Sequence, residues 1–162
     1  MVLLRYLYVV ALVLWVGGLI VAGALVAPSV FGVVQAWNAS EGRVLAGQVF
    51  GEVLLRLTWL SYAMGVIMFV TLTLHRLLGS RPAKYGIRVG IMGVMLAMMF
   101  AMGFYIIPQV NAIQAQVTGP VSALAESDAR RIEFNRLHGL SNILFSITAI
   151  GGLALCWWES RE

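Results

Sequence analysis

The sequence predicts an all-α integral membrane protein in which four transmembrane helices form a bundle. Of its 162 residues, 60% are hydrophobic and only 11% are charged, whereas about 25% are charged in a typical soluble domain. The apolar residues form four long stretches with most of the charges between them, and these run from Tyr6 to Val34, Leu57 to Leu74, Val89 to Ile107 and Leu137 to Trp158. At about 1.5 Å per helical residue, each can cross or nearly cross a hydrocarbon core about 30 Å thick.

The chain is expected to form a single transmembrane domain over residues 1–162, with spans at about 4–30, 50–76, 86–108 and 134–158. The first span resembles a secretory signal, because Arg5 precedes an apolar run and Ala22-Gly23-Ala24 imitates a cleavage site. The apolar run continues to Val34, which is longer than the apolar core of a signal peptide. We therefore expect a retained first span.

An interfacial helix is expected after the first span, because residues 35–51 mix polar and apolar side chains. The second span should begin before its uncharged part. Glu52 and Arg56 are four residues apart, so they can pair across one helical turn near the lipid headgroups. The simpler interpretation of this pair is a solvated helix end.

The third span is expected to end near Pro108, and an external excursion of about 25–30 residues should follow, with a turn at Gly119-Pro120. Ser127 or Asp128 can cap a helix whose charged first turns project from the membrane and continue into the fourth span. Small residues spaced for helix packing recur in the spans, for example Gly18 with Ala22 and Gly86 with Gly90. No repeat of fixed period is visible in the sequence.

The distribution of Lys and Arg predicts that both termini are cytoplasmic. The link between the second and third spans carries Arg76, Arg81, Lys84 and Arg88 without any acidic residue, and Arg5 falls on the same side. On the other side, basic and acidic residues are interleaved. The basic residues behind the net charge of +4 are therefore expected to contact lipid headgroups, and no nucleic-acid partner is expected.

One stripe of the fourth span is the strongest candidate for a polar site. His138 and Ser141 recur with Phe134 and Phe145 at helical spacing, and Asn142 is adjacent. Polar side chains within a membrane span either bond a neighbouring helix or line a site. The candidate polar cluster comprises Arg136, His138, Ser141, Asn142, Glu52 and Arg56.

Methionine is concentrated on the third span, where Met92, Met95 and Met99 share one helical face. Thioethers favour soft ions such as Cu(I), so these residues and His138 are candidate metal ligands. A methionine stripe is also common as flexible packing material. His75 and His138 should lie at opposite faces of the membrane, which argues against a shared metal or haem in one chain.

Several short motifs taken together resemble one family of membrane proteins. They are Leu14-Trp15-Val16-Gly17-Gly18, Ala27-Pro28 followed by Phe31, Ala46-Gly47 followed by Phe50-Gly51, Pro108, and Phe134-Asn135-Arg136-Leu137-His138-Gly139-Leu140-Ser141. In this order they are similar to the family built on domain of unknown function 4149, the transmembrane protein 205-like proteins. The resemblance implies a four-span bundle with an outer segment before the fourth span, draws attention to Arg136, His138 and Ser141, and implies no established reaction.

The Trp-Val-Gly-Gly portion also resembles copper-resistance membrane domains. Those domains commonly carry a histidine upstream of the tryptophan, where this chain has Tyr6 and Tyr8.

The chain shows no motif of a catalytic site, so we expect it not to be an enzyme, and no cofactor is predicted. The leading hypothesis is a structural or accessory subunit of a larger membrane assembly, with other subunits or further copies of the chain as partners. The alternative is a transporter or binding protein for a soft metal or small ligand, and a haem-binding electron carrier is a third hypothesis. The expected location is the cytoplasmic membrane of a bacterium, as a multi-pass protein.

Overall fold

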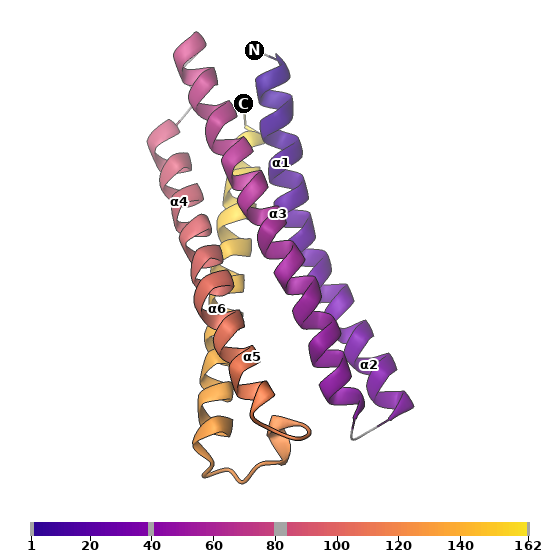
Figure 1. Cartoon of the computed structure of the whole chain (residues 1–162). Coiled ribbons are helices and arrows are strands. Elements are labelled where there is room, and N and C mark those ends of the chain that lie inside the picture. The colour runs from indigo at the N-terminus through magenta and orange to yellow at the C-terminus, as the bar shows by residue number, and fades with distance from the viewer. Residues whose placement is uncertain (1, 39–40, 80–83, 162) are drawn as a thin grey trace.

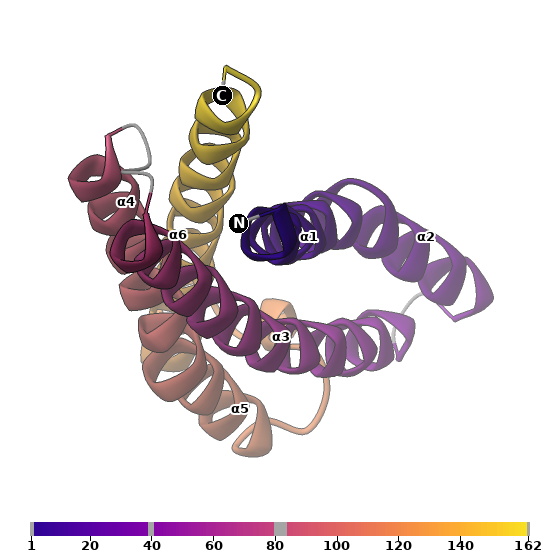
Figure 2. The same ribbon diagram turned by 90° about the horizontal axis from the view of Figure 1, so that it is seen from above.

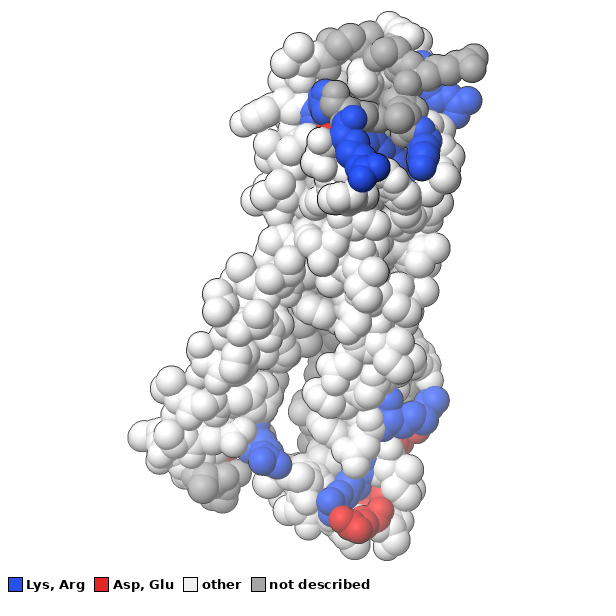
Figure 3. Space-filling view, turned by 180° about the vertical axis from the view of Figure 1, so that it is seen from behind, with Lys and Arg blue, Asp and Glu red and all other residues white. Residues whose placement is uncertain are grey.

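The computed structural model describes residues 2–38, 41–79 and 84–161, and within these residues it is helical with no strands. Four helical runs are long and apolar enough to cross a membrane, namely Val2–Trp37, Gly42–Leu78, Tyr85–Ala115 and Ala129–Glu159. Charged side chains gather toward the two ends of the molecule, and the surface between them is uncharged in Figure 3. The all-α fold with four apolar helices is therefore confirmed, and its apolar helices suit a lipid bilayer.

The first two runs form one antiparallel hairpin. The first consists of α1 (Val2–Val21), the π-helical segment η1 (Ala22–Val26) and α2 (Ala27–Trp37), and the second is α3 (Gly42–Leu78). The residues of the predicted interfacial helix are largely helical, but they do not form a separate helix. Its residues are divided between the end of α2 and the first turns of α3, and the turn between them is held by the Gly42 amide, which donates to the Asn38 carbonyl.

The last two runs form a second hairpin. The first comprises α4 (Tyr85–Ala101), the π-helical segment η2 (Met102–Ile106) and α5 (Ile107–Ala115). A loop with the short 3₁₀ helix η3 (Val121–Ala123) leads to α6 (Ala129–Glu159). The external excursion is shorter than expected because the helix continues past Pro108 to Ala115, while Asp128 caps α6 as predicted.

The four helices form a ring in which α1 and α4 lie at opposite corners. Helix α1 packs on α3 and α6, and α4 packs on the same two helices. Both termini lie at one end of the bundle (Figure 1), which we call the terminal end. At the other end, the distal end, the two hairpins part and leave an open slot in the space-filling view (Figure 3).

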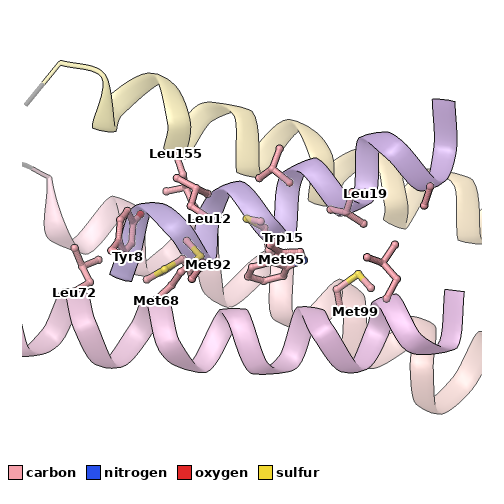
Figure 4. Close-up of a cluster of buried hydrophobic side chains, with 14 residues drawn as sticks. Tyr8, Leu12, Trp15, Leu19, Met68, Leu72, Met92, Met95, Met99 and Leu155 are labelled. Carbon is pink, nitrogen blue, oxygen red and sulfur yellow. The ribbon is translucent and has the colours of Figure 1, made fainter. Parts of the chain in front are cut away.

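The centre of the ring is a packed apolar core near the terminal end. Side chains of α1, α3, α4 and α6 point toward one another there, with Trp15 beside Met95 (Figure 4). Trp15, Met68 and Met92 are fully buried. A smaller cluster at the distal end joins η2, α5, η3 and α6.

Each π-helical segment ends two residues before a proline of the same helix. Pro28 and Pro108 have no amide hydrogen to donate within the helix, and a proline ring crowds the preceding turn. In both places one wider turn precedes the proline, since the Ala27 amide donates to the Ala22 carbonyl and the Ile107 amide donates to the Met102 carbonyl. The helix thus passes the proline without ending, which is a recurrent use of π-bulges.

The two helical runs that contain a π-helical segment, α1–η1–α2 and α4–η2–α5, are called the first and the second bent helix. They repeat one structural pattern, although no repeat is visible in the sequence alone. A shift of 80 residues superimposes η1 on η2 and Pro28 on Pro108. The same shift superimposes five buried positions of the first bent helix on five of the second: Tyr8, Leu12, Trp15, Leu19 and Ala22 on Arg88, Met92, Met95, Met99 and Met102. The paired residues differ in type, so the repeat lies in burial and backbone geometry.

Candidate functional site

A cluster of charged residues at the terminal end is the most unusual polar feature of the structure. The Glu159 carboxylate lies between two arginines, with Oε1 at 2.6 Å from Arg5 Nε and Oε2 at 3.1 Å from Arg88 Nη2. Arg5 also donates to the Glu159 backbone carbonyl at 3.3 Å. The three side chains come from α1, α4 and α6 and join the ends of three helices.

Arg88 has the most deeply buried side chain of the three. Its side chain is only 2% exposed, against 43% for Arg5. An ion is costly to bury unless it is paired, so the position of Glu159 stabilises the buried guanidinium. The Tyr8 ring adds a second favourable contact, since its centroid lies 5.7 Å from Arg88 Cζ.

A small crevice opens onto this ion pair. It is lined by Leu4, Arg5, Tyr8, Thr71, Leu72, His75, Arg88 and Glu159. With two guanidinium groups and one carboxylate, the cluster carries a net positive charge at the helix ends. It can therefore fix the arrangement of the helices and attract anionic groups at the headgroup level.

This cluster is not among the predicted sites, because the sequence places Arg88 in the basic link between the second and third spans. A signal was present nonetheless. Arg88 lies four, seven and eleven residues before Met92, Met95 and Met99, so it extends the same buried stripe of α4. Arg81, which was assigned to the same link, lies outside the described residues.

The predicted polar residues of α6 make mostly local interactions, and Arg136 lies on another face of the helix than His138, Ser141 and Asn142. Arg136 pairs with Glu133 at 2.6 Å. His138 is exposed, and its ring stacks on Phe134 with centroids 6.3 Å apart. The Ser141 hydroxyl donates to the His138 backbone carbonyl at 2.8 Å, and Asn142 is exposed.

Glu52 and Arg56 form the predicted pair along α3, with Oε1 2.9 Å from Nε. Both side chains are more than half exposed. The six predicted residues therefore form two groups on different helices, with Glu52 and Arg56 paired on α3 and the other four on α6.

The candidate metal ligands are also separated. Met92, Met95 and Met99 are buried in the core with Met68, whereas His138 is exposed on α6 (Figure 4). Within residues 2–38, 41–79 and 84–161, no three His, Cys, Asp or Glu side chains are grouped so that they could hold a metal ion. Of the predicted soft-metal ligands, Met92, Met95 and Met99 belong to one buried cluster, and His138 does not.

Asp128 caps the start of α6. Its carboxylate accepts from the Arg130 backbone amide at 2.8 Å and pairs with the Arg130 guanidinium at 2.7 Å. The pKa of Asp128 is lowered to about 2, first by the side-chain hydrogen bond from Arg130 and second by the hydrogen bond from the Arg130 backbone amide. This residue is an ionised helix cap at neutral pH.

A comparison with known protein families places most of the chain in one of them. The family model described as a domain of unknown function (DUF4149) matches residues 10–118, which include most of the first span, the second and third spans and both π-helical segments. No curated protein and no solved structure matches the chain.

Proposed function

The chain belongs to the family of membrane proteins built on domain of unknown function 4149, and from that premise we propose that it is a non-catalytic, structural or accessory subunit of a larger membrane assembly. We also propose a closer likeness to transmembrane protein 205-like proteins. The most specific motif for that likeness, at residues 134–141, lies beyond the residues that the family model matches.

The observation that carries this proposal is a row of small residues on the outer face of α4. Gly86, Gly90, Gly93 and Ala97 follow one another at helical spacing, and all four are exposed. A Cβ atom built at any of the three glycines would meet no atom within 4 Å. Glycines elsewhere are used inside the chain, since a Cβ at Gly65 would collide with Leu96 and one at Gly152 would collide with Val16.

Small residues let transmembrane helices approach closely, and close packing is the main source of helix association in lipid. A glycine row that the chain does not use for its own packing therefore suits a helix of another subunit or of a second copy. We propose this outer face of α4, defined by Gly86, Gly90, Gly93 and Ala97, as the docking face.

We further propose that the termini are cytoplasmic and that the membrane is a bacterial cytoplasmic membrane. Arg5, Arg76, Lys84, Arg88 and Arg161 all lie toward the terminal end, and cytoplasmic ends retain an excess of positive charge. Single cysteines placed at exposed positions near either terminus, in a Cys156→Ser background, should be labelled only after intact cells are permeabilised. Labelling of both from outside would overturn the orientation.

The assembly itself is tested by extracting the chain from native membranes in a mild detergent. We expect a particle larger than the monomer, and we expect Gly90→Leu with Gly93→Leu to release a monomer that keeps its helix content. Gly139→Leu is the matched control, since Gly139 is also exposed with no atom within 4 Å of its built Cβ. A wild-type chain that is monomeric and co-purifies with no other subunit would contradict the proposal.

A second candidate function is the binding or transport of a soft metal, and it is supported by the four buried thioethers of Met68, Met92, Met95 and Met99. Protein purified without added metal should then contain a stoichiometric soft metal, measured by elemental analysis, and Met92→Leu with Met95→Leu should lose it. Metal-free protein, or metal that survives the double substitution, would eliminate this candidate.

A further inference from the structure

The two ends of the bundle hold their basic residues in different ways. At the distal end, four of the five described arginines each pair with a different carboxylate: Arg56 with Glu52, Arg130 with Asp128, Arg131 with Glu126 and Arg136 with Glu133. At the terminal end, Glu159 is the one described acid, against five described basic residues, namely Arg5, Arg76, Lys84, Arg88 and Arg161. The net positive charge of the described residues therefore lies at the terminal end, where Figure 3 shows mainly basic side chains.

Two of the terminal cations lie over aromatic rings of neighbouring helices. Arg76, near the end of α3, has its Cζ 4.3 Å from the ring centroid of Tyr85 in α4. Lys84 directly precedes α4, and its Nζ lies 5.8 Å from the ring centroid of Trp158 in α6. Trp158 packs against the apolar core, and the Tyr85 hydroxyl lies 3.2 Å from the Thr73 hydroxyl, so both rings are held in place. We call Arg76, Lys84, Tyr85 and Trp158 the basic corner.

The positive charges of the basic corner are not balanced by a carboxylate of the described residues. An aromatic ring attracts a cation but supplies no opposite charge. Both carboxylate oxygens of Glu159 are bonded elsewhere, one to Arg5 and the other to Arg88. Arg76 and Lys84 are exposed, so the corner presents two fixed positive charges at the ends of three helices.

We propose that the basic corner binds the headgroup of one anionic phospholipid, whose phosphate accepts hydrogen bonds from Arg76 and Lys84. Helix ends lie at the level of the lipid headgroups, where basic residues between helices bind anionic lipids. Hydrogen bonds from a guanidinium or an ammonium to a phosphate are among the strong ones. Exposed apolar side chains also lie close to both cations along the chain, Leu77 after Arg76 and Ile87 three residues after Lys84, and acyl chains can contact them.

The same arrangement disfavours a zwitterionic lipid. Its ammonium would need a carboxylate or the face of an aromatic ring. The Glu159 oxygens are occupied, and Tyr85 and Trp158 each already hold a cation of the chain. The ammonium would instead meet the like charges of Arg76 and Lys84. A free phosphate ion has the required charge, but it gains nothing from the exposed apolar neighbours.

The test uses the full chain in nanodiscs that contain phosphatidylglycerol and phosphatidylcholine in equal amounts. After transfer to mild detergent, native mass spectrometry counts the lipids that remain bound. We expect one phosphatidylglycerol per chain, retained at least about tenfold over phosphatidylcholine, since each basic residue near an anionic headgroup contributes about 1 kcal/mol. Added inorganic phosphate should not displace it. Equal retention of the two lipids, or displacement by inorganic phosphate, would overturn the proposal.

A pair of double substitutions separates the basic corner from the net charge of the chain. Arg76→Gln with Lys84→Gln should abolish the preference for phosphatidylglycerol, and both residues are exposed, so the fold should be kept. Arg43→Gln with Arg130→Gln removes the same charge from the distal end and should keep the preference. Equal losses in the two variants would show that net charge alone attracts the lipid.

The role of the rings is tested without any change of charge. Tyr85→Leu with Trp158→Leu leaves Arg76 and Lys84 in place but removes the rings beneath them, so retention of phosphatidylglycerol should fall about fivefold. The control is Trp157→Leu, which removes the local contact of Trp157 with Arg161 at the end of α6 and should remain near wild type. Unchanged retention in the double variant, with helix content equal to wild type by circular dichroism, would contradict the proposed corner.

Discussion

The two bent helices share a backbone plan and differ in the side chains placed on it. Both have buried positions in the same register, a π-helical segment of five residues and a proline two residues after it. The second helix carries Arg88 where the first carries Tyr8, and methionines where the first carries Gly18 and Ala22. The shared features determine how each helix crosses the bundle, whereas one of the differences, Arg88 in place of Tyr8, contributes to the charged cluster.

The comparison also explains the tight seams between the hairpins. The bent helix of each hairpin lies against the second helix of the other hairpin at a glycine, with Leu96 of α4 against Gly65 and Val16 of α1 against Gly152. Leu96 and Val16 are themselves related by the shift of 80 residues. The repeat therefore extends from the bent helices to their packing.

The largest expected effect comes from the difference at the terminal end. Glu159→Gln leaves the buried Arg88 guanidinium without its carboxylate, and breaking a buried ion pair in this way typically costs about 3 kcal/mol or more of unfolding free energy. The loss should be measured by denaturant titration in detergent, followed by circular dichroism. Arg5→Gln is the control, and it should cost much less because Arg5 is 43% exposed. Equal losses in the two variants would show that the burial of Arg88 does not determine the loss of unfolding free energy.

The tight seams should be next in magnitude, and they test whether the two halves are equivalent. Gly65→Val and Gly152→Val each place a side chain against the facing helix, and overpacking of this kind costs about 1–3 kcal/mol. Thermal unfolding of both variants should show losses of similar size. Gly139→Val, at an open position, should remain near wild type. A loss at only one seam would break the proposed equivalence.

The prolines should have smaller effects on stability but visible effects on shape. In Pro28→Ala and in Pro108→Ala, an ordinary α-helical turn can replace the wider turn, because alanine restores the amide hydrogen. Spin labels at Val33 and Asn111, on exposed positions of α2 and α5, should report a changed distance between the distal limbs in either variant. An unchanged distance in both variants would show that the prolines do not set the bend.

The smallest effect should come from the loop of the second hairpin, where Asp128 caps α6. The pKa of Asp128 lies at about 2, below its ordinary value of 3.8. Its contribution to stability is therefore fully present above about pH 4 and is lost as the pH falls toward 2. Hydrogen exchange of the first turns of α6 should accelerate over this interval, and Asp128→Asn should remove the pH dependence. Acceleration that persists in Asp128→Asn would assign it to another carboxylate.

The four helices could be predicted because membrane crossing imposes a long apolar run on each of them. The start of α6 was also predictable, since Asp128 precedes a helix with charged first turns. The pairing of Glu52 with Arg56 followed from spacing alone. These features depend on neighbouring residues, which a sequence displays directly.

The charged cluster and the repeat were not predictable in the same way, because they depend on residues far apart in the chain. Glu159 meets Arg5 across 154 positions, and nothing local to either residue indicates this. The repeat preserves burial but replaces most residue types, as where Trp15 corresponds to Met95, and only a few residues such as Pro28 and Pro108 are identical. The π-helical segment η2 also lets the third helical run continue past Pro108. A proline in a sequence ordinarily suggests the end of a helix.

The most direct test of the repeat is a scan of oxygen accessibility with single spin labels along residues 2–37 and 85–115 in a lipid bilayer. We expect two helical profiles that superimpose after a shift of 80 residues, each with a break of phase at its π-helical segment, 22–26 in one and 102–106 in the other. Profiles that keep one unbroken helical period through both prolines, or that do not superimpose at this shift, would contradict the account.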